Sequence, residues 1–151
     1  MNAATEPASG PGAPPRWEHF EHGADIGVRG VGPTPAAAFE QAALALTAVA
    51  TDPAGVRPLE SVPIRCPGHD LEPLLVDWLN ALVYETATRK LFFGRAEVAL
   101  GPGGLEGLAW GEPVDVARHQ PAVEVKGATY TMLRVERTGD GSWLAQCVVD
   151  V

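Results

Sequence analysis

One stretch of the sequence constrains the fold more than any other. Between Asp70 and Arg89, large apolar residues recur at the spacing of one helical face, as Leu74, Leu75, Trp78, Leu79, Leu82 and Val83. This pattern predicts a strongly amphipathic helix, with Asp70 at its N-cap and Glu72 in the first turn, where a negative charge favours the helix dipole. Because burying each of these side chains contributes about 1.5–3 kcal/mol, we expect this helix to be the spine of the core.

A second helix is predicted from residue 35 to residue 50. Thr34 is a favourable N-cap, and Pro35 suits the first helical position, where its missing N–H costs nothing. Apolar residues then follow at spacings of three and four, as Phe39, Ala43, Leu46 and Ala50. Asp52 and Pro53 are expected to close the helix.

The remaining sequence indicates short strands. Alternation of apolar and polar residues predicts strands at residues 17–22, 26–28, 62–66, 92–100, 105–110, 123–135 and 143–151. In the 92–100 strand, Phe92 is expected on the apolar face and Phe93 on the polar face. Residues 101–104 and 138–142 are typical hairpin turns. The sequence therefore predicts an α+β fold with a largely antiparallel sheet of about six or seven strands packed with two helices.

The chain is expected to form one domain. Residues 1–15 are small residues, Gly and Pro, with Glu6 as the only charged side chain, and predict a disordered leader. Residues 16–151 then form a single folded domain. No apolar run approaches the ~18 residues of a membrane-spanning helix, and the N-terminus lacks the pattern of a secretory signal. We therefore expect a cytoplasmic protein without a membrane partner.

Charge and cysteine content exclude several classes of function. The formal net charge is −8, with 11 Lys and Arg against 19 Asp and Glu. This balance disfavours direct binding to nucleic acid, which needs clustered cations, and suits a basic partner or a cation. Cys66 and Cys147 are expected to be small, partly buried residues without a disulfide role. The sequence also lacks phosphate-binding glycine loops and a hydrolase nucleophile elbow.

Three acidic groups form a candidate metal site. Asp25 lies at the start of a predicted strand, Asp150 is the penultimate residue, and Val151 carries an α-carboxylate. If the fold brings them together, they make an all-oxygen site for a hard divalent cation such as Ca²⁺ or Mg²⁺. The alternative is a pair of solvated acids in loops, because carboxylates so far apart in sequence need tertiary structure to meet.

One lysine and four histidines are further candidates for a functional role. Lys126 falls on the polar face of the predicted 123–135 strand, where it either contacts a phosphate or acidic group or pairs with Glu124 as a solvated lysine. His19 and His22 are three residues apart in a strand and point to opposite faces, which disfavours a two-histidine metal site. The other two, His69 and His119, are expected at the surface in loops.

Four blocks of sequence carry a family resemblance. They are HGADIGVRGVGPTPAAAFEQAALAL, DLEPLLVDWLNALVYE, GEPVD followed by EVKGATYTMLRV, and WLAQCVVDV. Their order and content resemble the archease family, and together they cover nearly all of residues 17–151. The resemblance implies a compact α+β fold with a strand-helix-strand-strand kernel.

The resemblance also implies a function. Archeases are accessory proteins of the tRNA-splicing type of RNA ligase, which joins 2′,3′-cyclic phosphate ends to 5′-hydroxyl ends. They speed formation of the ligase's guanylylated histidine and support multiple turnover, without being enzymes themselves. The family's metal site, expected to hold Ca²⁺, corresponds to Asp25, Asp150 and Val151, and its functional lysine corresponds to Lys126. A stand-alone metal-dependent hydrolase and a general chaperone or scaffold are the competing functions.

Two positions depart from the family pattern. Gly23 replaces the threonine that follows the first histidine, and we expect only a local change of backbone. Thr131 replaces the histidine that follows Thr-Tyr, so no role of that imidazole can be assigned to this chain.

Overall fold

The computed structural model describes residues 14–151. The elements in chain order are β2 (Arg16–His22), β3 (Asp25–Gly32), α1 (Pro35–Ala50), the 3₁₀ turn η1 (Pro53–Gly55), β4 (Glu60–Pro67), α2 (Leu71–Arg89), β5 (Leu91–Gly101), β6 (Gly104–Pro113), α3 (Val116–His119), β7 (Gly127–Ala128), β8 (Arg134–Arg137) and β9 (Trp143–Asp150). Of the leader predicted at residues 1–15, residues 1–13 lie outside the described residues, so that prediction stays untested.

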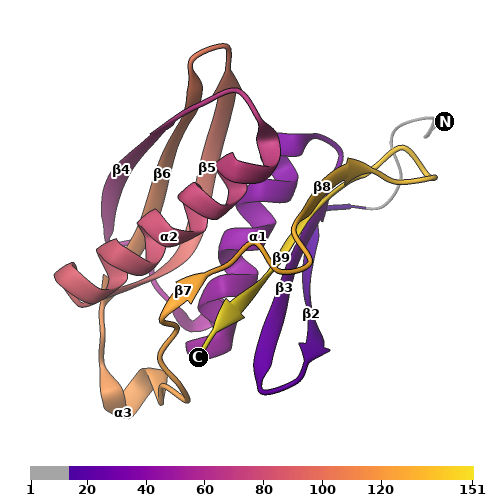
Figure 1. Cartoon of the computed structure of the whole chain (residues 1–151). Helices are drawn as coiled ribbons and strands as arrows, with labels where there is room; N and C mark the ends of the chain where they lie inside the picture. The colour runs from indigo at the N-terminus through magenta and orange to yellow at the C-terminus, as the bar shows by residue number, and fades with distance from the viewer. Residues whose placement is uncertain (1–13) are drawn as a thin grey trace, which may run out of the picture.

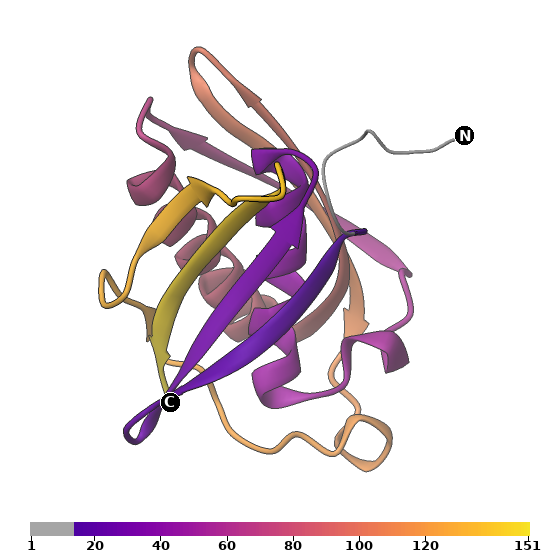
Figure 2. The ribbon, with the colours of Figure 1, turned by 90° about the vertical axis from the view of Figure 1, so that its right-hand side faces the viewer.

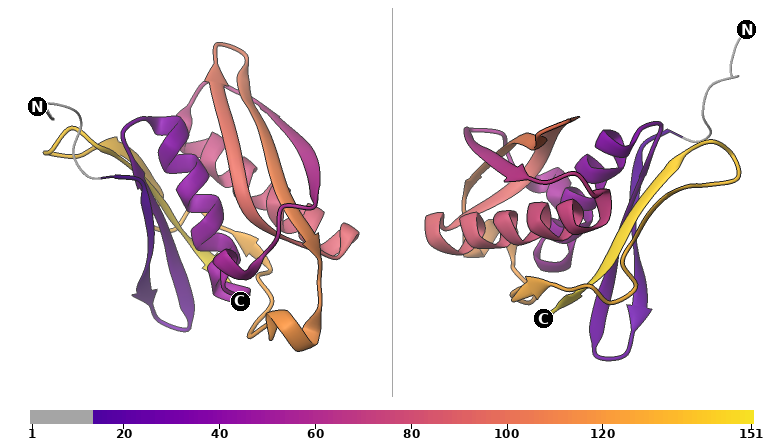
Figure 3. Two further views of the ribbon diagram at one scale, coloured as in Figure 1. Left: turned by 180° about the vertical axis from the view of Figure 1, so that it is seen from behind. Right: turned by 45° about the horizontal axis from the view of Figure 1, so that its top comes forward.

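The strands form two sheets with the long helices packed between and across them (Figure 1). One sheet has the order β2-β3-β9-β7, with β8 also paired to β9, and the other has the order β4-β6-β5. Figure 2 looks onto the first sheet, and Figure 3 shows α1 lying between the two sheets. Within residues 14–151 no helix is both long and apolar enough to cross a membrane.

The predicted fold class is confirmed. Every strand pairing among residues 14–151 is antiparallel, and β4, α2, β5 and β6 form the strand-helix-strand-strand kernel that the resemblance implies. The described part of the chain has eight strands, and they divide into two sheets because each long helix needs an apolar surface on more than one side.

Helix α2 has the role in the core that its sequence predicts. Of the six apolar side chains in its predicted stripe, five are buried and Val83 is half-buried. Trp78 is fully buried and donates from Nε1 to the carbonyl of Phe39 at 3.0 Å, which connects α2 with α1. Asp70 occupies the N-cap without a side-chain capping bond, whereas Thr34 accepts from the backbone N–H of Ala37 at 3.1 Å.

A bulge in β5 overturns one detail of the predicted alternation. Phe92 and Phe93 are both buried, because the register shifts between Phe93 and Arg95. Gly94 permits this shift by lying close against η1: a Cβ there would sit 2.6 Å from the carbonyl oxygen of Pro53. A side chain at residue 94 would therefore force the two segments apart.

The single strand predicted at residues 123–135 is wrong. Ala128 pairs with Val149 and Arg134 pairs with Gln146, so residues 129–133 lie opposite only residues 147–148. Five residues facing two make an enlarged β-bulge, which separates β7 from β8. We refer to residues 129–133 as the β7–β8 bulge.

Replacing Trp78 by alanine should strongly destabilise the protein. The change removes a fully buried aromatic side chain and its bond to α1, and such truncations cost about 3–5 kcal/mol. Tyr84→Ala, on the exposed face of the same helix, is the matched control and should stay within about 0.5 kcal/mol of wild type. Urea unfolding followed by circular dichroism measures both, and equal effects would contradict the assignment of the core face.

Candidate functional site

Strand pairing brings the predicted acidic residues to one end of the larger sheet. Ile26 of β3 pairs with Val149 of β9, so the next position along the ladder sets Asp25 opposite Asp150. On the other edge of β9, Gly127 of β7 pairs with Asp150. Residues about 125 positions apart in the sequence thus become neighbours.

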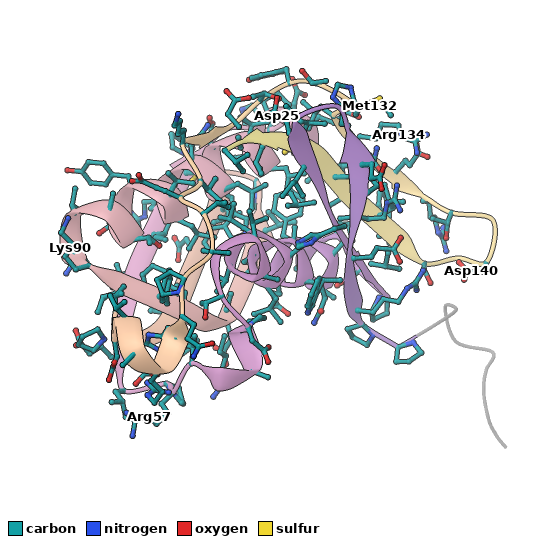
Figure 4. All side chains as sticks on the ribbon, turned by 90° about the horizontal axis from the view of Figure 1, so that it is seen from below. Asp25, Arg57, Lys90, Met132, Arg134 and Asp140 are labelled. Carbon is teal, nitrogen blue, oxygen red and sulfur yellow. The ribbon has the colours of Figure 1, made fainter. Side chains whose placement is uncertain are left out.

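The two aspartates also share one face of this sheet. A Cβ on Gly30 would lie 2.0 Å from the carbonyl oxygen of Ala38 in α1, so the even-numbered residues of β3 face that helix. Asp25 therefore lies on the outer face, and Asp150, its cross-strand neighbour, lies on the same face. Such neighbours have Cβ atoms roughly 4.5–5.5 Å apart, a distance at which two carboxylates repel each other. Figure 4 shows Asp25 at this end of the sheet.

The main chain fixes Lys126 beside the aspartates. Its backbone N–H donates to the carbonyl of Asp150 at 2.8 Å, and its side chain is exposed in the extended segment just before β7. The long strand that was expected to carry Lys126 is absent. The backbone bond to β9 still places Lys126 at the end of the sheet that carries Asp25 and Asp150. Among the ion pairs of residues 14–151, none joins Lys126 to Glu124.

Asn80 of α2 holds the opposite edge of β7. Its Oδ1 accepts from the N–H of Ala128 at 2.8 Å, and its Nδ2 donates to the carbonyl of the same residue at 3.2 Å. The amide side chain thus satisfies both backbone groups, as a neighbouring strand would. The sequence analysis missed Asn80, because its only signal is its place in the helical block that resembles archease.

The donor atoms at this end suit a hard cation. Within the described residues, no three side chains of His, Cys, Asp or Glu converge as metal ligands. The available groups are the carboxylates of Asp25 and Asp150 and main-chain carbonyls, with Val151 next to them. Ca²⁺ takes six to eight oxygen ligands and accepts water among them, so this all-oxygen set fits a cation that keeps part of its hydration shell.

Both departures from the family pattern lie next to this end of the sheet. Gly23 has φ +60° in the two-residue turn between β2 and β3, a backbone conformation that glycine adopts without strain and threonine does not. Thr131 is exposed in the β7–β8 bulge, and its carbonyl accepts from the N–H of Val148 at 3.0 Å.

The prediction that His119 is a surface residue is wrong. His119 is buried at the end of α3, with its Nε2 2.9 Å from Oε2 of the equally buried Glu112. The backbone N–H of Asp115 donates to Nδ1 at 2.9 Å, so Nδ1 is the acceptor and Nε2 carries the proton donated to Glu112. The local sequence around residues 116–120 gives no sign of this burial, which depends on tertiary pairing.

Glu112 is the centre of a buried polar cluster. Arg118 donates to its Oε2, and Arg57 donates from both its backbone N and its Nε at 3.0 Å. The bond from Arg118, supported by those from Arg57 and His119, holds the pKa of Glu112 well below its ordinary value of 4.5, although burial acts in the opposite direction.

This cluster anchors the segment that leads to Lys126. Thr51 donates from Oγ1 to the carbonyl of His119 at 2.7 Å, and Ala122 donates its N–H to the carbonyl of Ala50 at 2.8 Å. The end of α1 therefore holds residues 119–122, and β9 holds the same segment again at Lys126.

Known proteins with similar sequences identify the family of this chain. The sequence matches the model of the Archease protein family (MTH1598/TM1083) over residues 17–151. Protein archease of Pyrococcus furiosus is 41% identical over 140 residues, covering 90% of this chain and 99% of its own. Protein archease of Thermococcus gammatolerans is 42% identical over 140 residues, with the same coverage. The chain belongs to the archease family.

A solved structure agrees with this membership. The solution structure of Methanobacterium thermoautotrophicum protein 1598 is similar with a TM-score of 0.72 and 29% sequence identity, covering 89% of this chain and 98% of that one. The similarity therefore extends over most of the chain and nearly all of that structure.

With glutamine in place of Glu112, the protein should lose less stability than wild type as the pH falls. Because the folded pKa of Glu112 is depressed, its contribution is fully present above the unfolded value near 4.5 and is lost as pH falls through the lower folded value. Glu112→Gln should therefore be less stable than wild type at neutral pH, with the difference shrinking below about pH 4. Glu106→Gln, in the exposed pair with Arg65, is the control and should change neither the stability at neutral pH nor its dependence on pH. Urea unfolding at several values between pH 3 and pH 7 gives the free energy of unfolding of each variant. Parallel curves of this free energy against pH for wild type and Glu112→Gln would contradict the prediction.

Removing one aspartate should relieve repulsion and abolish the response to cations. Asp25→Asn should melt at or above the wild-type temperature in a chelator, because cross-strand like charges destabilise a sheet. Added Ca²⁺ should raise the melting temperature of wild type, since a cation at a hundredfold excess over its Kd contributes roughly 2.7 kcal/mol. The variant should lose this rise, whereas Asp77→Asn on the exposed face of α2 should keep it. No rise in wild type with Ca²⁺ or Mg²⁺ would contradict the cation site.

Proposed function

We propose that this archease is a cytoplasmic accessory protein that activates an RNA ligase of the tRNA-splicing type. The family is known for its association with RNA ligase, and the membership extends from residue 17 to residue 151. The observation that carries the proposal is the meeting of Lys126 with Asp25 and Asp150 at one end of the larger sheet. In this proposal the protein promotes guanylylation of the ligase histidine and multiple turnover, and catalyses no reaction itself.

The chemistry of the site supports this role. Asp25, Asp150 and the carboxylate of Val151 would hold a divalent cation, which we propose to be Ca²⁺ and which supplies positive charge for phosphate oxygens. The ammonium of Lys126, on a stem that reaches about 6 Å, offers a second positive charge to the same phosphates. Net charge of −8 suits docking on a basic ligase surface and gives no basis for direct RNA binding.

A stand-alone hydrolase has less support. An apolar cavity of about 360 Å³ lies between the two long helices and residues 121–125, and Glu124 is the one ionisable side chain among those lining it. The lining includes neither Asp25 nor Asp150, so the cavity and the acidic groups do not form a joint active site. A hydrolase needs a nucleophile or a general base beside its substrate.

A guanylylation assay tests the proposed function. The cognate ligase, GTP and a divalent cation are mixed with and without this protein, and the covalent ligase–GMP adduct is followed before steady state. We expect faster adduct formation and several ligation cycles per ligase, with no ligation by this protein alone. Unchanged kinetics with both proteins folded would contradict the proposal. Nucleotide hydrolysis by this protein alone would favour the hydrolase, and equal stimulation by an unrelated chaperone would favour a general chaperone.

Lys126→Ala should lose the stimulation while the fold stays intact. The side chain is exposed, so its removal should change stability by no more than about 0.5 kcal/mol. Lys90→Ala, the only other lysine in the chain, is the matched control and should stimulate like wild type. Lys126→Arg separates two roles: it keeps activity if positive charge suffices and fails if a compact ammonium must fit. Full stimulation by Lys126→Ala at saturating nucleotide and cation would show that Lys126 has no role.

A further inference from the structure

The β7–β8 bulge exposes two large side chains next to the candidate site. Tyr130 is 64% exposed and Met132 is 51% exposed, although methionine is among the residue types most often buried and tyrosine is intermediate. The bulge starts two positions along β9 from Asp150, because Thr129 donates its N–H to the carbonyl of Val148 at 3.0 Å. In Figure 4, Asp25 and Met132 lie at the same end of the sheet.

Several hydrogen bonds fix the backbone of the bulge. Thr129 donates from Oγ1 to the carbonyl of Val148 at 2.8 Å, and the same hydroxyl accepts from the N–H of Thr131 at 3.2 Å. Val148 in turn donates its N–H to the carbonyl of Thr131 at 3.0 Å. Met132 has φ +55°, a left-handed conformation that non-glycine residues adopt only with some backbone strain. The exposed side chains therefore stand on a backbone held in one conformation.

A chain of polar side chains, with one buried member, runs across the strands of the larger sheet and holds Met132. Gln146 of β9 is fully buried and donates from Nε2 to the carbonyl of Met132 at 3.0 Å. Its Oε1 accepts from Nε of Arg29 at 2.9 Å, and Arg29 donates to Glu18 at 2.5 Å. This bond from Arg29 lowers the pKa of Glu18. A buried amide is costly unless both of its ends are paired, and here both are.

This arrangement has the properties of a preorganised binding surface. Tyrosine and methionine are enriched where proteins meet, and large side chains on a fixed backbone bind with a smaller loss of entropy. Enlarged bulges commonly redirect side chains next to functional sites. The chain as a whole has a net charge of −8, so a complementary partner surface carries basic groups around an apolar pocket.

We propose that Tyr130 and Met132 are the docking anchors of this protein, inserting into an apolar pocket with a basic rim on its protein partner. The inference rests on the proposed function, since the partner is then the RNA ligase. The bulge binds the ligase surface, and this contact positions Lys126 and the two aspartates at the ligase nucleotide site. Thr131, between the two anchors, helps to fix the bulge through its carbonyl, and its side chain has no part in the docking contact.

Affinity measurements on matched variants test the docking anchors. Titration calorimetry gives the Kd of the purified full-length chain for the cognate ligase, and thermal unfolding checks each variant. Tyr130→Ala and Met132→Ala should each weaken binding about tenfold or more, the size expected for an anchor residue. Tyr130→Phe should retain wild-type affinity, because the ring fills the pocket. Leu59→Ala is the control: Leu59 is 64% exposed and lies two residues from Arg57, at the far end of the molecule from Met132 in Figure 4.

The outcomes separate the two proposals. If the wild-type chain neither binds nor stimulates the ligase, the proposed function fails and the docking surface fails with it. If wild type binds and Tyr130→Ala and Met132→Ala bind equally well, only the docking anchors are overturned. An equal loss with Leu59→Ala would also overturn them, because the effect would not be specific to the bulge. Weak binding by Tyr130→Phe would replace the apolar pocket with a hydrogen bond to the hydroxyl.

Discussion

Hydrogen bonding along both edges of β9 determines where every candidate residue lies. On one edge β9 pairs with β3, and on the other it pairs with β7 and β8. The first edge sets Asp25 against Asp150, and the second sets Lys126 against the same residue. Since register is fixed by the buried face of a strand, the inward-facing Ala145, Cys147 and Val149 hold the acidic end in place. The packing of the core therefore also sets the geometry of the candidate site.

Two acidic environments in this fold have opposite character. Glu112 is buried and receives hydrogen bonds from Arg57, Arg118 and His119, so its charge is compensated within the protein. Asp25 and Asp150 face each other, and neither takes part in an ion pair within residues 14–151. A compensated charge contributes to stability, whereas an uncompensated pair contributes only through what it binds.

Features set by local sequence were predicted well, and features set by distant partners were not. The limits of α1 and α2 follow closely from their periodicity and from the N-caps Thr34 and Asp70, and the structure adds that a left-handed Lys90 ends α2. The break at residues 129–133 could not be predicted, because this segment has no Gly or Pro and its turn depends on bonds from Gln146 and Val148. Burial of His119 likewise requires Glu112 and Arg118. Asp25, Asp150 and Lys126 were named as candidates from their chemistry and from the family resemblance, but their placement at one end of one sheet follows only from the strand register.

The β7–β8 bulge divides one edge of the sheet into two independently registered pieces. Gly127 and Ala128 are aligned by Asp150 and Val149, while Arg134 is aligned by Gln146. Adding or deleting a residue between them would therefore leave both alignments unchanged, since loop closure depends only weakly on length. Lys126 keeps its place whatever the bulge contains. A foreign peptide could therefore be grafted at this point without disturbing the sheet, to redirect the protein to another target.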